Sequence, residues 1–286
     1  MGGVPFSRKM HTIGQCGLCA RKKSDMGIVV ITIPGRAKRE FVNSLHRATD
    51  GRVDLVIIQK PRHRGFMQSL ARLRRTVGWL NFPKELWYAL VLRFDKRIEK
   101  ALTYFRETSL SNAEASFLPP VIETDSVNSD DIHRELAARS PDLFVVWGST
   151  ILQPRILTTG KQAINLHFGY CPHYRGALAN QHAVFSGDRA RIGATIHHIN
   201  GKADAGAILA LIPADVSQRP RELFRKLNDE ARERYVEIAT RLLDGESLPV
   251  ESQDNHNGNV LLLKQWTPSL RYDVGRKVLE WERSMV

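Results

Sequence analysis

The chain is poor in cysteine and has no long apolar run. Its 286 residues include only three cysteines, which argues against a disulfide framework and is typical of a reducing compartment, so we expect a cytoplasmic location. Cys16 and Cys19 form half of a zinc knuckle, but no second pair follows, and we expect no zinc there. No stretch reaches the roughly 18–20 apolar residues of a membrane-spanning helix. The first 24 residues lack the apolar core of a secretory signal.

Basic residues outnumber acidic ones, and the excess lies in two segments. The formal net charge is +12; residues 1–24 hold five Lys and Arg and no acid, and residues 60–106 hold twelve against three acids. The rest of the chain is therefore near neutral, which argues against a protein that binds nucleic acid over its whole surface. We expect residues 1–25 to be a basic flexible tail, and the sequence leaves open whether they belong to the native protein.

From residue 27 onward, strand patterns alternate with helix patterns. Apolar and β-branched runs predict strands at 28–33, 53–58, 120–122, 143–147, 162–166, 192–197 and 207–213. Helical periodicity predicts helices after residue 36, after Ser129 and over 222–243, with a final helix around 274–281. This alternation predicts an α/β fold with a doubly wound, mostly parallel sheet. In such sheets ligands bind beyond the carboxyl ends of the strands.

Residues 62–118 interrupt this alternation. Apolar residues recur at helical spacing from Phe66 to Leu80 with arginines between them, and Pro83 begins a second helical pattern. We expect a helical hairpin that packs on the sheet or across a homodimer. The alternative is a basic surface over residues 60–106 that meets an anionic substrate, RNA or a membrane.

An amide, an imidazole and a carboxylate stand near the ends of two predicted strands. Asn165 and His167 end the first strand, and Asp204 follows the second. We expect the carboxyl ends of these neighbouring strands to meet, which would bring the three side chains together. Asn can donate to a developing oxyanion, His can donate or carry a proton, and Asp can hold that His or accept a proton from an amine. Such a set suits acyl-group transfer.

The residues around these three closely resemble the core of the formyltransferases that use 10-formyltetrahydrofolate. That family carries Asn-x-His, a Pro-x-Tyr-Arg-Gly turn, a helix ending in Gly-Asp, a Gly-x-Thr-Ile strand and Asp-x-Gly. The matching residues here are Asn165, His167, Pro172, Tyr174, Arg175, Gly176, Gly187, Asp188, Gly193, Thr195, Ile196, Asp204 and Gly206. The resemblance implies a Rossmann-like formyltransferase catalytic domain over 26–213, with the insertion 62–118 inside it and a C-terminal helix and short appendage over 214–286.

The resemblance also implies a chemistry. The co-substrate would be 10-formyltetrahydrofolate, the acceptor a primary amine, and no metal would be required. Asn165 and His167 would stabilise the negative charge on the formyl oxygen, while Asp204 orients His167 and relays the amine's proton. The folate pocket would be lined by Gly148, Ser149, Thr150, Ile151, Leu152, Ile199, Asn200, Gly201 and Lys202. The acceptor would be met by Tyr174, Arg175 and Gly176.

Three further features invite a functional interpretation. Cys171 stands where relatives often carry Leu, and we expect a small core residue rather than a reactive thiol. The turn at 34–38 could bind phosphate at a helix N-terminus, but it lacks a Gly-rich loop, and we expect a generic turn. His197 and His198 fall on opposite faces of one strand, which argues against a shared metal.

The identity of the amine acceptor is the feature that the sequence determines least. A short tail after the core favours the sugar N-formyltransferases, which act on nucleotide-linked amino sugars. Methionyl-tRNA formyltransferase would carry a C-terminal barrel, glycinamide ribonucleotide transformylase a phosphate loop, and formyltetrahydrofolate hydrolase an N-terminal regulatory domain. A non-catalytic formyltransferase-like protein that binds RNA or a membrane through 60–106 is the alternative from another class.

Overall fold

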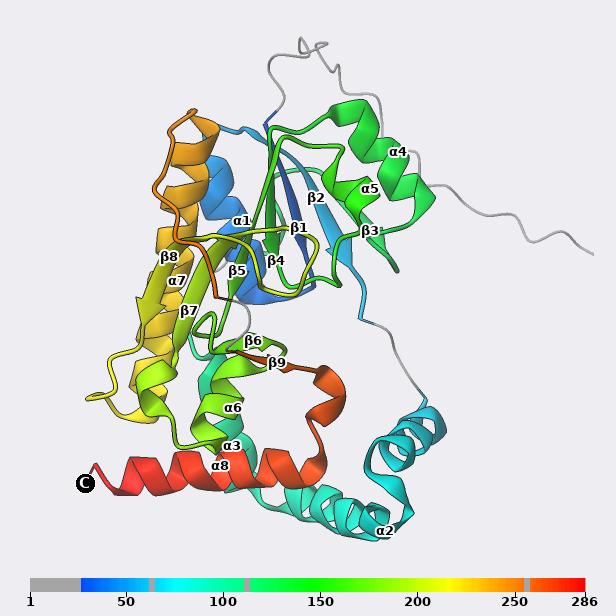
Figure 1. Cartoon of the computed structure of the whole chain (residues 1–286), viewed down its shortest axis with the longest axis vertical. Coiled ribbons are helices and arrows are strands. Elements are labelled where there is room, and N and C mark those ends of the chain that lie inside the picture. The colour runs from blue at the N-terminus through cyan, green and yellow to red at the C-terminus, as the bar shows by residue number, and fades with distance from the viewer. Residues whose placement is uncertain (1–26, 62–64, 111–113, 255–257, 286) are drawn as a thin grey trace, which may run out of the picture.

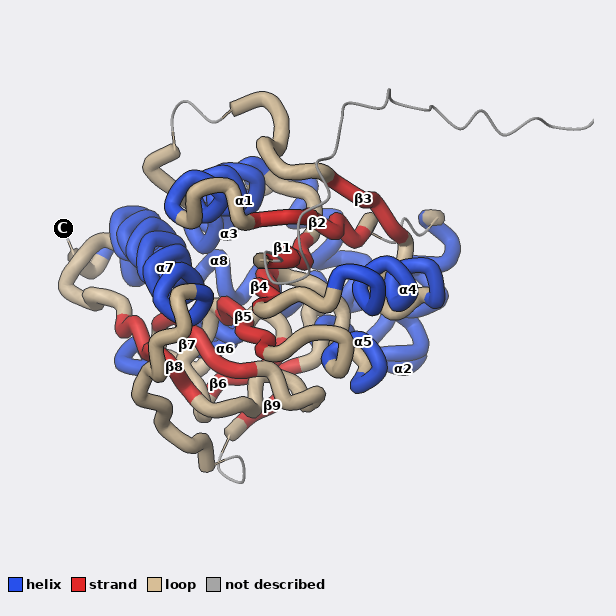
Figure 2. Tube along the Cα trace, turned by 90° about the horizontal axis from the view of Figure 1, so that it is seen from above, coloured by secondary structure: helices blue, strands red, loops and turns tan. Residues whose placement is uncertain are grey.

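The structure, a computed structural model, describes residues 27–61, 65–110, 114–254 and 258–285. The predicted N-terminal tail, with Cys16 and Cys19, lies outside these residues. A seven-stranded sheet of order β3-β2-β1-β4-β5-β7-β8 forms the centre (Figure 1). Helices cover both of its faces, α1 and α7 on one side and α4 and α5 on the other (Figure 2). The predicted α/β fold is confirmed.

The strands follow the predicted runs closely. The parallel part consists of β1 (Ile28–Thr32), β2 (Val53–Gln59), β3 (Val121–Thr124), β4 (Leu143–Trp147) and β5 (Gln162–His167). Two antiparallel strands follow, β7 (Gly193–His198) and β8 (Ile208–Pro213). A separate parallel pair joins β6 (Tyr174–Gly176) to β9 (Asn259–Leu261).

The helices have the following bounds. The α-helices are α1 (Arg36–Ala48), α2 (Phe66–Phe94), α3 (Lys96–Thr103), α4 (Asp130–Arg139), α5 (Pro154–Leu157), α6 (Ala179–Phe185), α7 (Pro220–Leu243) and α8 (Pro268–Arg283). Short 3-10 turns cover Tyr104–Arg106, Arg189–Arg191 and Leu263–Gln265. The long helix predicted over 222–243 forms and begins two residues earlier, at Pro220.

The core lies on both faces of the sheet because β1 and β4 bury every side chain. On one face, Phe41 of α1 stacks on Tyr235 of α7 with ring centroids 5.1 Å apart. The Tyr235 hydroxyl donates to the Val146 carbonyl at 2.9 Å and accepts from the Val146 N–H at 2.9 Å, which ties α7 to the centre of the sheet. On the other face, Ile132 and Leu136 of α4 pack in a second buried cluster.

One expectation about the sheet is wrong. β7 runs antiparallel to β5, with Asn165 opposite His197 and His167 opposite Thr195. The carboxyl ends of these two strands therefore lie at opposite ends of the pair and do not meet. Proximity between Asp204 and β5 must come from the loop that follows β7.

The insertion differs from one of the two expected arrangements, a hairpin packed on the sheet; packing across a homodimer stays a prediction. Its main helix, α2, is broken at Gly78, whose φ of 77° is outside the helical region, rather than at Pro83. α2 packs against α8 and not on the sheet: Glu85 accepts from the Ser269 N–H at 2.8 Å, and Tyr88 lies 5.2 Å from Tyr272. Figure 1 shows α2 extending beyond α8, away from the sheet.

Candidate active site

β5 places the first two candidate side chains. Residues two apart on a strand share a face, so Asn165 and His167 point to the same side of the sheet at its carboxyl end. His167 is buried, and Asn165 is half-buried.

Asp204 reaches β5 through a tight loop after β7. Its φ of 46° lies in the left-handed region, a conformation that Asp tolerates better than most residues because its side chain can bond locally. Its Oδ1 accepts from the Asn165 amide nitrogen at 3.1 Å, and its Oδ2 lies 3.5 Å from His167 Nδ1. The predicted amide, imidazole and carboxylate therefore come together.

A second imidazole, which we did not place in the site from the sequence, completes the cluster. His197 of β7 is buried, and its Nε2 lies 3.3 Å from Asp204 Oδ1 and 3.2 Å from Asn165 Nδ2. Its Nδ1 lies 2.8 Å from the His198 carbonyl. The two histidines do face opposite ways, but antiparallel pairing sets His197 opposite Asn165. The sequence alone does not show this, because two residues on paired strands that face one side are recognised as neighbours only once the register is known.

The surroundings of His167 define what its ring can do. Nε2 lies 3.1 Å from the Tyr174 carbonyl, and Nδ1 faces Asp204. Both nitrogens thus face oxygen acceptors, but a neutral imidazole carries only one proton. The ring can therefore gain a second proton without losing a contact.

The protonation of the cluster follows from burial and charge. Burial lowers the pKa of His167, although the neighbouring Asp204 acts in the opposite direction. Burial alone would raise the pKa of Asp204, but His167, His197 and the Gly176 N–H outweigh it and lower that pKa to about 2. At neutral pH the site holds an ionised carboxylate beside a neutral imidazole.

The Pro-x-Tyr-Arg-Gly turn supports this cluster mainly through its backbone. The Gly176 N–H donates to Asp204 Oδ2 at 2.8 Å, and the Tyr174 carbonyl holds His167. Gly176 has a φ of 86°, and a Cβ there would lie 2.2 Å from the Leu261 carbonyl oxygen, so glycine is required. The Tyr174 hydroxyl points elsewhere and donates to Asp188 at 3.2 Å.

A cavity of about 570 Å³ is lined by Ala203 and Ala205, the two chain neighbours of Asp204, whereas Asn165, His167 and Asp204 are not among its lining residues. Its lining comes from the β6 turn, the loop after β7 and the C-terminal segment: Arg175, Asn200, Lys202, Ala203, Ala205, Gln253, Asp254 and Val260. The volume is in the range of small-molecule sites. Arg175 and Lys202 give one part of its wall a positive charge.

Comparison with known proteins identifies the family. The sequence model of the formyl transferase family matches residues 87–239. The chain belongs to this family.

Two curated relatives are methionyl-tRNA formyltransferases. That of Akkermansia muciniphila is 31% identical over 168 residues, covering 57% of this chain and 50% of the relative. That of Levilactobacillus brevis is 30% identical over 139 residues, covering 47% and 44%. The chain spans about half the length of these relatives.

Solved formyltransferases share the fold. A 4-N formyltransferase from Francisella tularensis superposes with a TM-score of 0.51 at 14% identity, covering 85% of this chain and 78% of that chain. The N-formyltransferase from Helicobacter canadensis, in complex with folinic acid and dTDP-3-aminofucose, gives a TM-score of 0.51 at 11% identity, covering 88% and 80%. These similarities establish the architecture of this formyltransferase family member.

The predicted folate residues occupy two loops. After β4, the Thr150 N–H donates to Gln59 Oε1 at 3.0 Å, and Gly148 has a φ of 80°. Ile151 is exposed, whereas Leu152 packs in the buried cluster under α4.

The second loop follows β7. The Asn200 amide donates to the Ala205 carbonyl at 3.0 Å, and its Oδ1 accepts from the Lys202 N–H at 3.1 Å. Ile199 packs against the same cluster as Leu152, and Gly201 has a φ of 81°. Leu152 and Ile199 therefore contribute to packing, and Asn200 and Lys202 line the cavity.

Cys171 and the turn at 34–38 lie at the margins of the site. Burial raises the pKa of the Cys171 thiol to about 12, and its sulfur lies 3.6 Å from the Asp204 carbonyl; such a thiol is a packing residue. Lys38 of α1 places its ammonium 4.6 Å from the centre of the Trp147 ring at the end of β4. Burial, with a contribution from Arg106, lowers its pKa to about 8.

Proposed function

We propose that this protein transfers a formyl group from 10-formyltetrahydrofolate to a primary amine. The observation that carries the proposal is the convergence of Asn165, His167 and Asp204, with a cavity lined by the two chain neighbours of Asp204. It is supported by membership of the formyl transferase family. We also propose a cytoplasmic location, in keeping with the low cysteine content.

The charges in the site suggest a division of labour. When the amine nitrogen bonds to the formyl carbon, negative charge grows on the formyl oxygen, and in this proposal the Asn165 amide and the His167 ring donate to it. The ring nitrogens of His167 already face the Tyr174 carbonyl and Asp204, so His167 must give up one of these contacts to donate. Losing one such donor typically costs about 3–4 kcal/mol of barrier. Asp204 is ionised and takes the amine's proton, which passes to the departing folate nitrogen as the old carbon–nitrogen bond breaks.

The contacts of Asn165 impose a condition on this chemistry. Its amide nitrogen already faces Asp204 at 3.1 Å and His197 at 3.2 Å. An incoming formyl oxygen must compete with one of these two acceptors. When Asp204 is protonated during transfer, it becomes a weaker hydrogen-bond acceptor and releases the Asn165 amide for the formyl oxygen. Proton transfer and oxyanion stabilisation are therefore coupled in this proposal.

For the acceptor we propose a nucleotide-linked amino sugar. Arg175 and Lys202 outnumber Asp254, the one acidic residue among those that line the cavity, and this balance suits an anionic group such as a diphosphate. The structurally similar protein from Helicobacter canadensis is in complex with dTDP-3-aminofucose. Methionyl-tRNA is the second candidate because the two curated relatives carry that name.

The test is a panel of amine acceptors incubated with 10-formyltetrahydrofolate, with tetrahydrofolate release and formylated product both measured. We expect turnover with nucleotide-linked amino sugars and its loss in His167→Ala and Asp204→Ala. His133→Ala, on α4 and outside both the cluster and the cavity lining, serves as the matched control and should retain turnover. Formylation of methionyl-tRNA, and not of an amino sugar, would make methionyl-tRNA the acceptor. Tetrahydrofolate release with water alone would indicate a hydrolase. No tetrahydrofolate release with any acceptor would refute the proposal.

A further inference from the structure

The second half of α2, residues 79–94, exposes a continuous apolar face. Trp79 is 72% exposed, Leu80 96%, Trp87 64% and Phe94 72%. With Leu86 and Leu90, which are also exposed, these residues form what we call the outer face of α2. Exposed large apolar residues on one element mark an interaction surface more often than chance scatter does.

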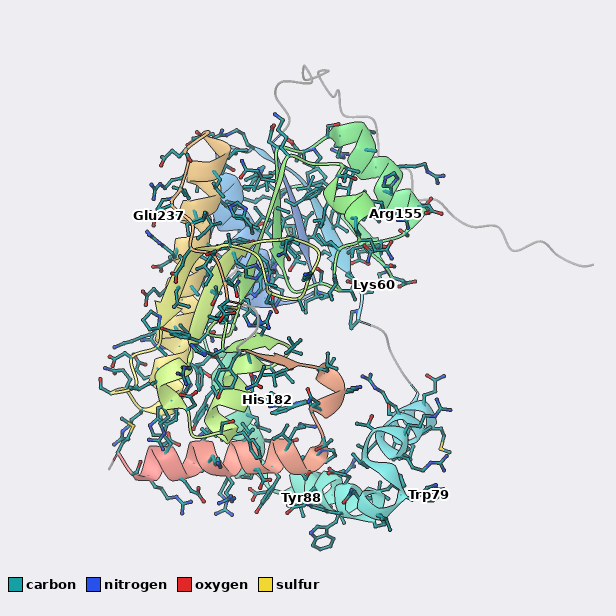
Figure 3. The ribbon with its side chains drawn as sticks, in the orientation of Figure 1. Lys60, Trp79, Tyr88, Arg155, His182 and Glu237 are labelled. Carbon is teal, nitrogen blue, oxygen red and sulfur yellow. The ribbon has the colours of Figure 1, made fainter. Side chains whose placement is uncertain are left out.

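Helical spacing shows that this is one face. At 3.6 residues per turn the six side chains fall within about 120° of the helix circumference, over a length of about 23 Å. The inner face is already used: Glu85 bonds to Ser269, Tyr88 packs on Tyr272 and Leu92 is buried. In Figure 3 Tyr88 lies beside α8, whereas Trp79 lies at the outer turn of α2. The inner contacts fix the helix with its outer face to solvent.

Positive charge borders the outer face. By the same spacing, Lys84 and Arg93 lie on its two sides, and Lys96 and Arg97 follow at its end. Arg97 and Lys96, with Trp87, Leu90 and Phe94, line a shallow hollow of about 510 Å³.

The first half of α2 adds to this charge. Arg72, Arg74 and Arg75 lie there, and the Arg74 guanidinium sits 4.6 Å from the centre of the Trp79 ring. The two acids in residues 66–97 do not oppose it, since Glu85 is bonded to α8 and Asp95 caps α3.

A second copy of the chain, RNA and a membrane would each make different contacts with the outer face of α2. A second copy would bring two strongly basic surfaces together, and like charges repel. RNA would gain from the cations and the tryptophans, but not from Leu80 and Leu90, which offer bases nothing to bond. An anionic membrane surface matches both parts, because phosphate head groups pair with Lys and Arg while Trp, Phe and Leu enter the acyl boundary.

We propose that the outer face of α2 binds an anionic phospholipid surface, with the helix lying in the plane of the membrane. Within the described residues no helix is long and apolar enough to cross a bilayer, so the contact is interfacial. α2 extends away from the sheet (Figure 1), and none of the candidate catalytic residues lies on it. None of the residues that line the 570 Å³ cavity lies on α2 either, so the proposed contact does not use the cavity wall.

The test is co-flotation of the full chain with vesicles of phosphatidylglycerol and phosphatidylcholine, compared with vesicles of phosphatidylcholine alone. We expect binding to the anionic vesicles only, weakened by salt. Trp87→Ser, Leu90→Ser and Phe94→Ser in one variant should lower the affinity by about tenfold or more. Val216→Ser with Val250→Ser, two exposed apolar residues elsewhere, is the matched control and should bind as the parent does.

A second variant keeps the test decisive if the first one unfolds. Arg72→Gln, Arg74→Gln and Arg75→Gln remove three positive charges and the Arg74 contact with the Trp79 ring, and we expect roughly fivefold weaker binding per charge removed. The proposal is refuted if the parent protein does not float with the anionic vesicles. It is also refuted if the charge variant and the apolar variant both float as well as the parent does. Salt-sensitive RNA binding without flotation, or a dimer that the serine variant dissociates, would assign the face to that partner instead.

Discussion

Replacing Asp204 by Asn tests the centre of the proposed mechanism. The side chain keeps its size and can still accept from the Gly176 N–H, which lies 2.8 Å from Oδ2. It loses the negative charge that faces His167 at 3.5 Å and His197 at 3.3 Å. The substitution therefore removes a proton acceptor with little change in shape.

Two magnitudes follow. Loss of a general base typically lowers kcat by about 10²–10⁴-fold. The carboxyl pKa is lowered from 3.8 to about 2, so the ionised form contributes roughly 2 kcal/mol to folding. A depressed folded-state pKa stabilises the protein above the unfolded value, so this contribution is present above about pH 4 and is lost as the pH falls towards 2.

The two effects are measured separately. Single-turnover formyl transfer at neutral pH reports the first, and denaturant unfolding of both proteins from pH 6 to pH 2 reports the second. We expect the free energy of unfolding of the parent, relative to Asp204→Asn, to fall by roughly 2 kcal/mol over that range. Asp131→Asn, an exposed acid on α4, should leave kcat unchanged. Full activity in Asp204→Asn, or a pH-independent stability difference, would refute the reasoning.

Three further predictions concern the frame of the site. Tyr235→Phe removes the buried hydroxyl that bonds to Val146, and chemical denaturation should show a loss of about 1–3 kcal/mol. Cys171 should resist alkylation in the native protein at pH 8, since its pKa is raised to about 12; peptide mass spectrometry checks this, and rapid labelling would contradict it. Gly176→Ala places a Cβ 2.2 Å from the Leu261 carbonyl oxygen at a φ of 86°. We expect about 1–3 kcal/mol of lost stability in thermal unfolding and a matching loss of transfer activity.

Much of the fold was predictable because the signals are local. The β-branched run at 28–33 predicts a buried strand and the apolar run at 143–147 predicts another strand, and both form. The long helix at 220–243 follows from its periodicity. The direction of β7 was not predictable in this way, since an apolar strand reads alike in either orientation.

The site, like the fold, was predictable only in its local features. The three residue types of Asn165, His167 and Asp204 were visible in the sequence, but our reason for their meeting was wrong. They meet because the loop after β7 turns back with Asp204 at a φ of 46° and the Gly176 N–H receives its carboxylate. His197 joins them through strand register, which no local pattern contains.

The sequence by itself determined the α/β class, the strand and helix positions and the residue types available for chemistry, because these depend on periodicity over a few residues. Only the tertiary structure decided that β5 and β7 run antiparallel, that a second histidine enters the cluster and that α2 faces outward. Each of these depends on contacts between residues far apart in the chain, where packing rather than local preference selects the arrangement.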